Sequence, residues 1–292
     1  MDKSLLCNSM YELIKKTSTE LPDDILGALI QAGLAEKKSS TAHDILTTIC
    51  ESVALSKNRA LPVCQDSGSV FAVIRARSTE IFLEVEEAIK RAIVDLTEQG
   101  ILRQNCVDTL TETNTGNNIG RHVPQIHFHP AEGPTHISLM LKGGGSENVS
   151  TQYSLPHEGL KAGRDFDGVQ RCILDAVFKA QGKGCAPGIL GVCIGGDRGS
   201  GYMIAKEQLF RKLHDRNDDE VIAQLEDRML EMANELDIGP MGLGGRTTAL
   251  GIKIGTAGRH PACYFVTVSY SCWATRRYCI ELDDSGAICT WL

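Results

Sequence analysis

The sequence predicts an α+β fold, in which an N-terminal helical layer is followed by a mixed β-sheet region with packed helices. Over about residues 1–100, apolar residues recur at the three- and four-residue spacing of helices. Over about 101–292, short alternating or fully apolar runs are typical of strands, and runs of glycine separate them. We expect a single domain over 1–292 with these two parts as subregions.

The expected elements follow from the same patterns. Pro22 and the two acids after it suit a first helical turn, where unpaired amides favour negative charge. Gly188 to Gly196 is a fully apolar strand candidate between two turn sequences. The expected helices cover 9–17, 22–36, 41–58, 80–99, 157–181 and 202–236, and the expected strands cover 125–130, 135–142, 188–196, 250–255 and 262–273.

Composition excludes several classes of protein. No apolar run approaches the roughly 18 to 20 residues of a membrane span, and the N-terminus lacks the apolar core of a secretory signal, so we expect a cytoplasmic protein that binds no membrane. The formal net charge of −7 argues against nucleic-acid binding, which needs clustered Lys and Arg in excess. A small anionic substrate is compatible with this charge, because it needs only a few local cations.

The chain contains 11 cysteines and no export signal, which disfavours a disulfide framework. Most of these cysteines are expected to be small buried hydrophobes. Three of them stand in or beside turns, where a sulfur can face a cavity: PVCQDSGS around Cys64, GKGCAPG around Cys185 and SYSCWATRR around Cys272. Their spacing alone matches no dense CxxC metal motif.

These stretches, together with KGGGSEN at 142–148, VCIGG after GCAPG, and RHPACYF before SCWATRR, carry a resemblance over nearly the whole chain. The sequence resembles the α subunit of class I fumarate hydratases and L(+)-tartrate dehydratases, which carry a [4Fe–4S] cluster. One departure is Cys185-Ala186-Pro187, where the family pattern has Cys-Pro-Pro.

The resemblance implies that Cys64, Cys185 and Cys272 hold the cluster and leave one iron without a protein ligand. An open iron can act as a Lewis acid on substrate oxygens, which suits a hydro-lyase that adds or removes water. The expected substrates are fumarate/malate or tartrate/oxaloacetate. Cys193 is a rival ligand, but its place in an apolar strand favours a core role.

Other site residues are implied in the same way. Gln65 and Asp66 match residues that contact substrate, with Asp66 in proton abstraction, although Asp-Ser-Gly is also a common turn sequence. Arg103 matches a substrate-binding arginine whose fork can grip a carboxylate. His260 matches an active-site residue that can transfer a proton, although a lone loop histidine is more often structural.

The Gly-rich stretches leave alternatives open. Gly144 and Gly145 could bring backbone amides close to a substrate carboxylate or could form a plain tight turn. GGDRGSG at 195–201 lacks the P-loop and dinucleotide-site patterns, and we expect a structural bend there. Arg276 and Arg277 could stabilise a thiolate-bound cluster or could be solvated surface residues.

The family's remaining substrate-binding and proton-transfer residues lie in a second region, which two-subunit forms carry on a separate β chain. We therefore expect a β subunit as partner, in an αβ or α2β2 heteromer. The alternative function is a non-catalytic iron–sulfur or zinc-binding subunit that regulates or assembles a partner.

Overall fold

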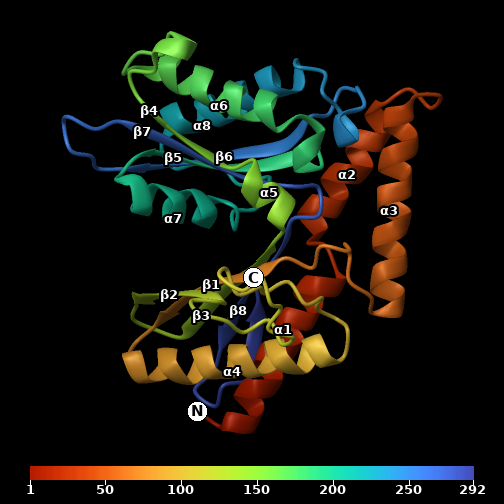
Figure 1. The fold of residues 1–292 in the computed structure, drawn as a ribbon, viewed down its shortest axis with the longest axis vertical. Helices are drawn as coiled ribbons and strands as arrows, with labels where there is room; N and C mark the ends of the chain where they lie inside the picture. Colours follow the sequence, from red (N-terminus) through yellow and green to blue (C-terminus); the bar gives the residue numbers. More distant parts are fainter. The chain divides into compact units, whose positions relative to one another are not determined.

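The computed structural model describes residues 1–292, which form two compact units (Figure 1). Unit 1 consists of Met1–Pro22, Glu51–Gly144 and Ala274–Leu292, and unit 2 of Asp23–Cys50 and Gly145–Trp273. Each unit has helices packed on a mixed sheet, so the predicted α+β class is confirmed. No helix has the length and apolar character that crossing a membrane requires.

Unit 1 is built on a five-stranded sheet in the order β2-β1-β3-β8-β9, with α1 and α4 packed on it. β1 runs parallel to β2, and the other neighbours are antiparallel. α4 buries Val85, Ile89, Ile93 and Leu96, whose spacing of three and four residues gives one apolar face. Its elements are α1 (Lys3–Thr19), β1 (Ser69–Ala76), α4 (Thr79–Glu98), β2 (Gln125–Pro130), β3 (Thr135–Lys142), β8 (Arg276–Leu282) and β9 (Ile288–Trp291).

Unit 2 has a four-stranded sheet in the order β4-β7-β5-β6, in which β5 and β6 are parallel. α7 covers one face of this sheet, and α6 and α8 cover the other (Figure 1). α3 (Thr41–Arg59) begins in unit 2 and ends in unit 1. The other elements are α2 (Asp23–Ala35), α5 (Gly144–Asn148), β4 (Thr151–Ser154), α6 (Phe166–Ala180), β5 (Gly188–Gly195), α7 (Arg198–Gln208), α8 (Glu220–Asn234), β6 (Ala249–Ala257) and β7 (Phe265–Ser271), with 3-10 turns at Glu158–Leu160, Gln181–Gly184 and Pro240–Gly242.

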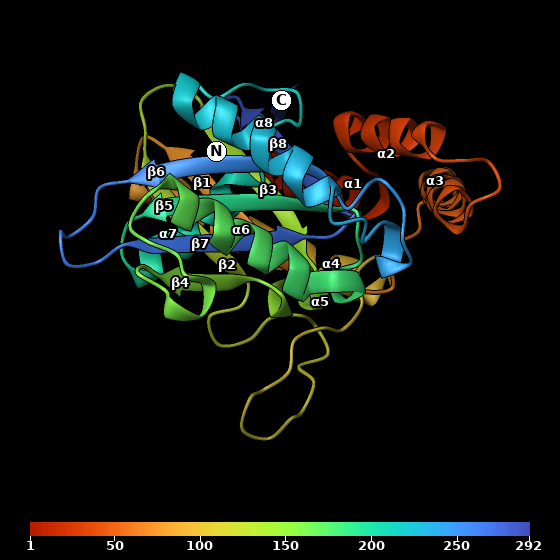
Figure 2. The ribbon, with the colours of Figure 1, turned by 90° about the horizontal axis from the view of Figure 1, so that it is seen from above.

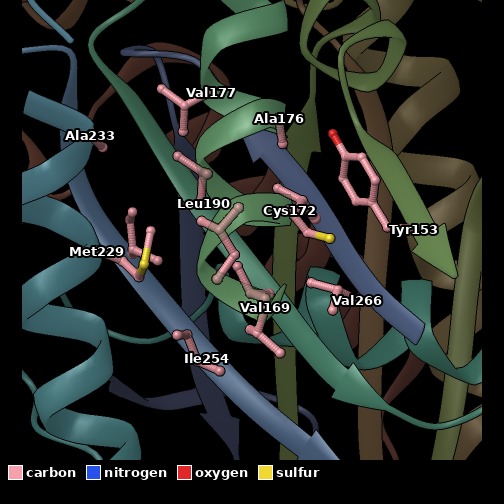
Figure 3. Close-up of a cluster of buried hydrophobic side chains, with 14 of the residues drawn as sticks. Tyr153, Val169, Cys172, Ala176, Val177, Leu190, Met229, Ala233, Ile254 and Val266 are labelled. Carbon is pink, nitrogen blue, oxygen red and sulfur yellow. The ribbon is translucent and has the colours of Figure 1, made fainter. Parts of the chain in front are cut away.

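The apolar core of unit 2 lies between the sheet and the helices α6 and α8. Leu190 and Val266 from the strands meet Val169 and Val177 of α6 and Met229 of α8 (Figure 3). β5 is buried along its whole length, as its unbroken apolar sequence predicts for a strand covered on both faces.

Several expected elements differ from the structure. The leading region is not a separate helical layer, because β1 lies within it and is the second strand of the unit 1 sheet. The helix expected over 157–181 starts only at Phe166, after its N-cap Asp165. The helices expected over 202–236 are α7, which begins earlier at Arg198, and α8. Asp219 caps the start of α8, where its side chain accepts hydrogen bonds from the Val221 and Ile222 amides. β4, β8 and β9 were not predicted.

Candidate functional site

In unit 1, three segments meet at one end of the five-stranded sheet. The loop around Cys64 and Asp66 precedes β1, Gly144 follows β3, and Arg276 begins β8; the register pairs Ser69 with Lys142 and Arg276 with Leu141. Gly68 has a φ of +78°, and a Cβ there would lie 2.9 Å from the Leu141 carbonyl carbon. The backbones approach so closely that only glycine fits at this point.

Asp66 is held at this end of the sheet by three hydrogen bonds. Its Oδ1 accepts from the Gly68 amide (3.0 Å), which is the turn expected of Asp-Ser-Gly. Its Oδ2 accepts from the Gly144 amide (2.7 Å), and its backbone carbonyl accepts from Arg276 Nη2 (2.8 Å). The Gly144 amide is therefore bound to Asp66 here, and does not point at open space as its predicted role requires.

Arg103 and Gln65 are exposed, and Arg103 is tied to the Asp66 loop through its backbone. Its amide donates to Ser67 Oγ (2.9 Å), and Asn118 Nδ2 donates to its carbonyl (2.6 Å). Ser67 is fully buried and also accepts from Asn105 Nδ2 (3.0 Å). The sequence analysis missed Ser67 and Asn118, which have no motif of their own and act by holding predicted residues.

In unit 2, Cys185 and Cys272 lie together at one end of the four-stranded sheet. Cys185 comes three residues before β5, Cys272 directly follows β7, and the Trp273 amide donates to the Cys185 carbonyl (3.2 Å). Cys185 is exposed and Cys272 half-buried. Gly145 lies near the turn that precedes Cys185, since a Cβ there would lie 3.7 Å from the Lys183 carbonyl oxygen. Unit 2 thus gathers two of the three predicted thiols.

Tyr270 is a buried residue at these thiols that the sequence analysis missed. A Cβ on Gly184 or Gly188 would lie 2.5 or 2.3 Å from its ring atoms, so the ring packs against glycines on both sides of Cys185. Burial, and then the nearby thiols of Cys272 and Cys185, raise the Tyr270 pKa well above its usual range. The phenol therefore keeps its proton at neutral pH and can only be a protonated O–H group there.

Gly188→Ala should lower the free energy of unfolding by about 1–3 kcal/mol, because the added methyl overlaps a ring that is 2% exposed and has no room to move. Gly27→Ala is the matched control, since a Cβ in this α2 position meets nothing within 4 Å. The control should be neutral or slightly stabilising. Urea unfolding of both variants measures the difference, and equal stabilities would contradict the packing of Tyr270.

Cys193, the rival ligand, is fully buried in β5, and Cys172 is fully buried in the core shown in Figure 3. Burial raises the Cys193 pKa to about 11. Burial and then the charge of Asp175 raise the Cys172 pKa to about 12. Cys193 has no exposed surface, so its expected core role is confirmed by its burial in β5.

Alkylation should separate these two classes of cysteine. With iodoacetamide at pH 8, Cys172 and Cys193 should stay unmodified in the folded, cluster-free chain, since on the order of a thousandth or less of each is thiolate and both are buried. The exposed thiols of Cys185 and Cys289 should be labelled. Mass spectrometry of the peptides reads the result, and labelling of Cys193 at the rate of Cys289 would contradict it.

His260 lies at the other end of the unit 2 sheet. It stands in the exposed β6–β7 connection, beyond the pairs Gly195–Ala257 and Ile194–Val266. Figure 2 shows this connection extending away from the end of the sheet. The eight residues of β5 separate that end from Cys185, which is about 25 Å at 3.3 Å per residue. Sequence proximity to Cys272 therefore did not mean spatial proximity, because the chain runs along the whole of β7 between them.

The loop of His260 is well held. His260 Nδ1 accepts from the Ala262 amide (3.1 Å), which leaves the proton of the neutral ring on Nε2. Arg164 donates to the carbonyls of Pro261 (3.1 Å) and Ala262 (2.7 Å). His260 and Cys263 line an open hollow of ≈ 630 Å³ with the start of α7. This hollow lies at the opposite end of the unit 2 sheet from Cys185 and Cys272.

The glycine loop at 195–201 and the two arginines that follow Cys272 each have a defined place in the structure. At 195–201, Asp197 caps α7 and accepts from Gly199 and Ser200, which agrees with the expected structural bend. Arg276 and Arg277 are 1% and 4% exposed, so the solvated surface alternative is wrong. No group of three or more His, Cys, Asp or Glu side chains in the structure could hold a metal ion.

Comparison with known proteins identifies the family to which the chain is similar. The model of the Fumerase family, described as fumarate hydratase, matches residues 7–281. A Geobacillus stearothermophilus protein that carries the name of a class I fumarate hydratase is 46% identical over 98% of this chain, and the chain spans 57% of that relative's length. Proteins of Methanocaldococcus jannaschii and Escherichia coli K12, both named as α subunits of L(+)-tartrate dehydratase, are 35% and 29% identical; the matches cover 92% and 94% of this chain, and 94% and 91% of theirs.

Proposed function

The chain belongs to the Fumerase family of fumarate hydratases, and from this premise we propose that it is the cluster-binding part of a hydro-lyase that acts on a small dicarboxylic acid. The substrate pairs are fumarate/malate or tartrate/oxaloacetate, the compounds in the relatives' names and their hydration partners. The observation that carries the proposal is that Cys185 and Cys272 lie close together in unit 2 as reduced thiols. Both residues fall within the segment that the family model matches.

The proposed ligands of a [4Fe–4S] cluster are Cys64, Cys185 and Cys272. All three are at least partly accessible to solvent, whereas the rival Cys193 is a buried neutral thiol. A cluster with three protein ligands has an open iron that supplies Lewis-acid chemistry to a hydroxyl and carboxylate. The donor set fits this cofactor because thiolates are the usual ligands of iron–sulfur clusters.

The chain's own residues are proposed to hold substrate and move a proton. Asp66, fixed by the amides of Gly68 and Gly144, would take the proton from the carbon next to the leaving hydroxyl. Arg103 and Gln65, both exposed beside it, would bind the substrate. A Cβ at Gly144 or Gly145 would meet no atom closer than 3.7 Å, so packing within the chain does not require glycine at either position. Because glycine has no Cβ, a ligand would have room to approach the backbone there.

The predicted proton transfer by His260 has no support from its position. It lies about 25 Å from the end of the sheet where Cys185 and Cys272 stand, by the strand length between them. We therefore leave it out of the residues proposed to act on substrate bound in the same chain.

We propose a β subunit as the partner, in an αβ or α2β2 heteromer. The two tartrate dehydratase relatives are named as α subunits, and this chain spans more than nine tenths of each. The Geobacillus relative is much longer than the match, so a chain of its kind carries further sequence that a β subunit would supply separately.

Anaerobic co-expression with a candidate β subunit tests the function. After reconstitution, iron and sulfide are quantified, and turnover is assayed with fumarate, malate and tartrate. We expect about four irons and four sulfides per chain and turnover of at least one acid. Bound iron and sulfide without turnover, and without any effect of these acids on the electron paramagnetic resonance spectrum, would favour a regulatory subunit. Zinc alone would contradict the cofactor.

A further inference from the structure

Arg276 is a buried cation with one side left unused. It is 1% exposed, the largest fully buried side chain in the molecule. Nε donates to the Ala274 carbonyl (3.2 Å) and Nη2 donates to the Asp66 carbonyl (2.8 Å). Nη1 is buried and has no hydrogen-bond partner. Both acceptors are neutral carbonyls, and no carboxylate forms an ion pair with this guanidinium.

This arrangement is costly in the protein as it stands. A guanidinium cannot lose its proton to avoid burial, because its pKa is above 12. An uncompensated buried charge costs several kcal/mol, and an unsatisfied buried donor adds to that cost. Unpaired buried donors are rare in folded proteins, and a bound ion or a catalytic role is among the usual reasons for one. The unused N–H groups of Nη1 therefore indicate an anionic acceptor.

The contacts of Arg276 indicate where in unit 1 an anion would bind. Its Nη2 holds the carbonyl of Asp66, two residues after Cys64, and its strand neighbour Leu141 lies just before the glycine run. Gly144 donates to the other side of Asp66. The Asp66 loop is thus fixed from β8 and from the end of β3, with Nη1 beside it.

We propose that Arg276 is a positioning residue that fixes the Asp66 loop and whose Nη1 donates to an anion bound at that loop. The inference rests on the proposed function for the anion's identity. Two anionic acceptors share this chemistry, a sulfur of the thiolate-bound cluster and a carboxylate oxygen of the substrate. A planar guanidinium suits both, since it donates in two directions at once.

The test compares Arg276→Met and Arg276→Lys with wild type in the reconstituted heteromer. Lys253→Met is the matched control, because Lys253 is a 5% exposed cation in unit 2 that pairs with Asp215 and Glu226. Iron and sulfide content, the midpoint potential, KM and kcat are measured. Urea unfolding establishes that each variant is folded, and Arg276→Lys keeps the charge if Arg276→Met is unstable.

The outcomes separate the two sources. A more negative midpoint potential in Arg276→Met, with KM unchanged and with recovery in Arg276→Lys, identifies a cluster sulfur. A KM raised about tenfold, with the potential unchanged, identifies the substrate carboxylate, as expected for one charge-assisted hydrogen bond. Unchanged potential and KM, with only a loss of stability like that of Lys253→Met, would overturn the proposal.

Failure of the proposed function would look different. If wild type binds no iron and sulfide, calorimetric titration with succinate, an unreactive dicarboxylate, still decides the role of Arg276. We expect binding by wild type and at least a tenfold weaker affinity in Arg276→Met. Equal affinities, or no succinate binding by wild type, would reject the anion site.

Discussion

Cys272→Ser is expected to remove the bound cluster and to lower kcat/KM by about 10³-fold or more. A Lewis acid that stabilises a departing hydroxide contributes several kcal/mol to the transition state, and each 1.36 kcal/mol is a factor of ten in rate. Cys272 lies beside Cys185, joined through the Trp273 amide, so Cys185→Ser should have the same effect. Cys64→Ser tests the ligand from unit 1. Iron and sulfide content, followed by the hydratase assay, measure these losses.

Two cysteine variants serve as controls for this prediction. Cys289→Ser changes an exposed thiol and should leave iron content, sulfide content and rate unchanged. Cys193→Ala removes the buried rival and should cost stability while the cluster is retained. Loss of the cluster in Cys193→Ala, with retention in Cys272→Ser, would show that the ligand set is wrong.

Glu226→Ala is expected to lower the free energy of unfolding by about 3–5 kcal/mol, the cost of breaking a buried ion pair from one side. Glu226 is 5% exposed and lies 2.6 Å from Arg211 Nη1 and 3.8 Å from Lys253 Nζ. It also accepts from the Ile254 amide (2.7 Å), which joins α8 to β6. Without it, two cations lose a charge partner and one buried amide loses its acceptor. Urea unfolding measures the change.

Glu220→Ala is the control on the same helix. Its carboxylate pairs with Arg216 at the surface, where both side chains are more than half exposed, so the loss should be much smaller than that of Glu226→Ala. Replacing Arg211 and Glu226 together by methionine should recover part of the loss, since no buried charge is then left unpaired. A Glu226→Ala loss as small as that of Glu220→Ala would mean that the network contributes nothing.

Local patterns in the sequence were sufficient where a segment's own residues decide its structure. The period of α4 and the apolar run of β5 predicted both elements because each buries the face that its spacing defines. The place of Cys193 in that run predicted its core role. The turn at Asp66 was recognisable because its side chain bonds to an amide two residues away.

Features that depend on contacts between residues far apart in the sequence could not be predicted. β1 was missed because a short apolar run reads as strand only when its neighbours β2 and β3, more than fifty residues ahead, are known to pair with it. The sequence left the burial of Arg276 open for a similar reason, since tandem arginines normally face solvent and only pairing with β3 places this one inside. No sequence pattern marks Ser67, and its role is visible only from the hydrogen bonds that Arg103 and Asn105 donate to it.

The sequence by itself determined the fold class, the family and the short turns that present Cys64, Cys185 and Cys272, because motifs and periodicity depend on neighbours along the chain. Only the tertiary structure decided that Cys185 adjoins Cys272, that Asp66 is held by Gly144 and Arg276, and that His260 stands a strand's length from the thiols. Twelve residues along a strand span most of a domain, whereas sheet pairing brings together segments more than eighty residues apart.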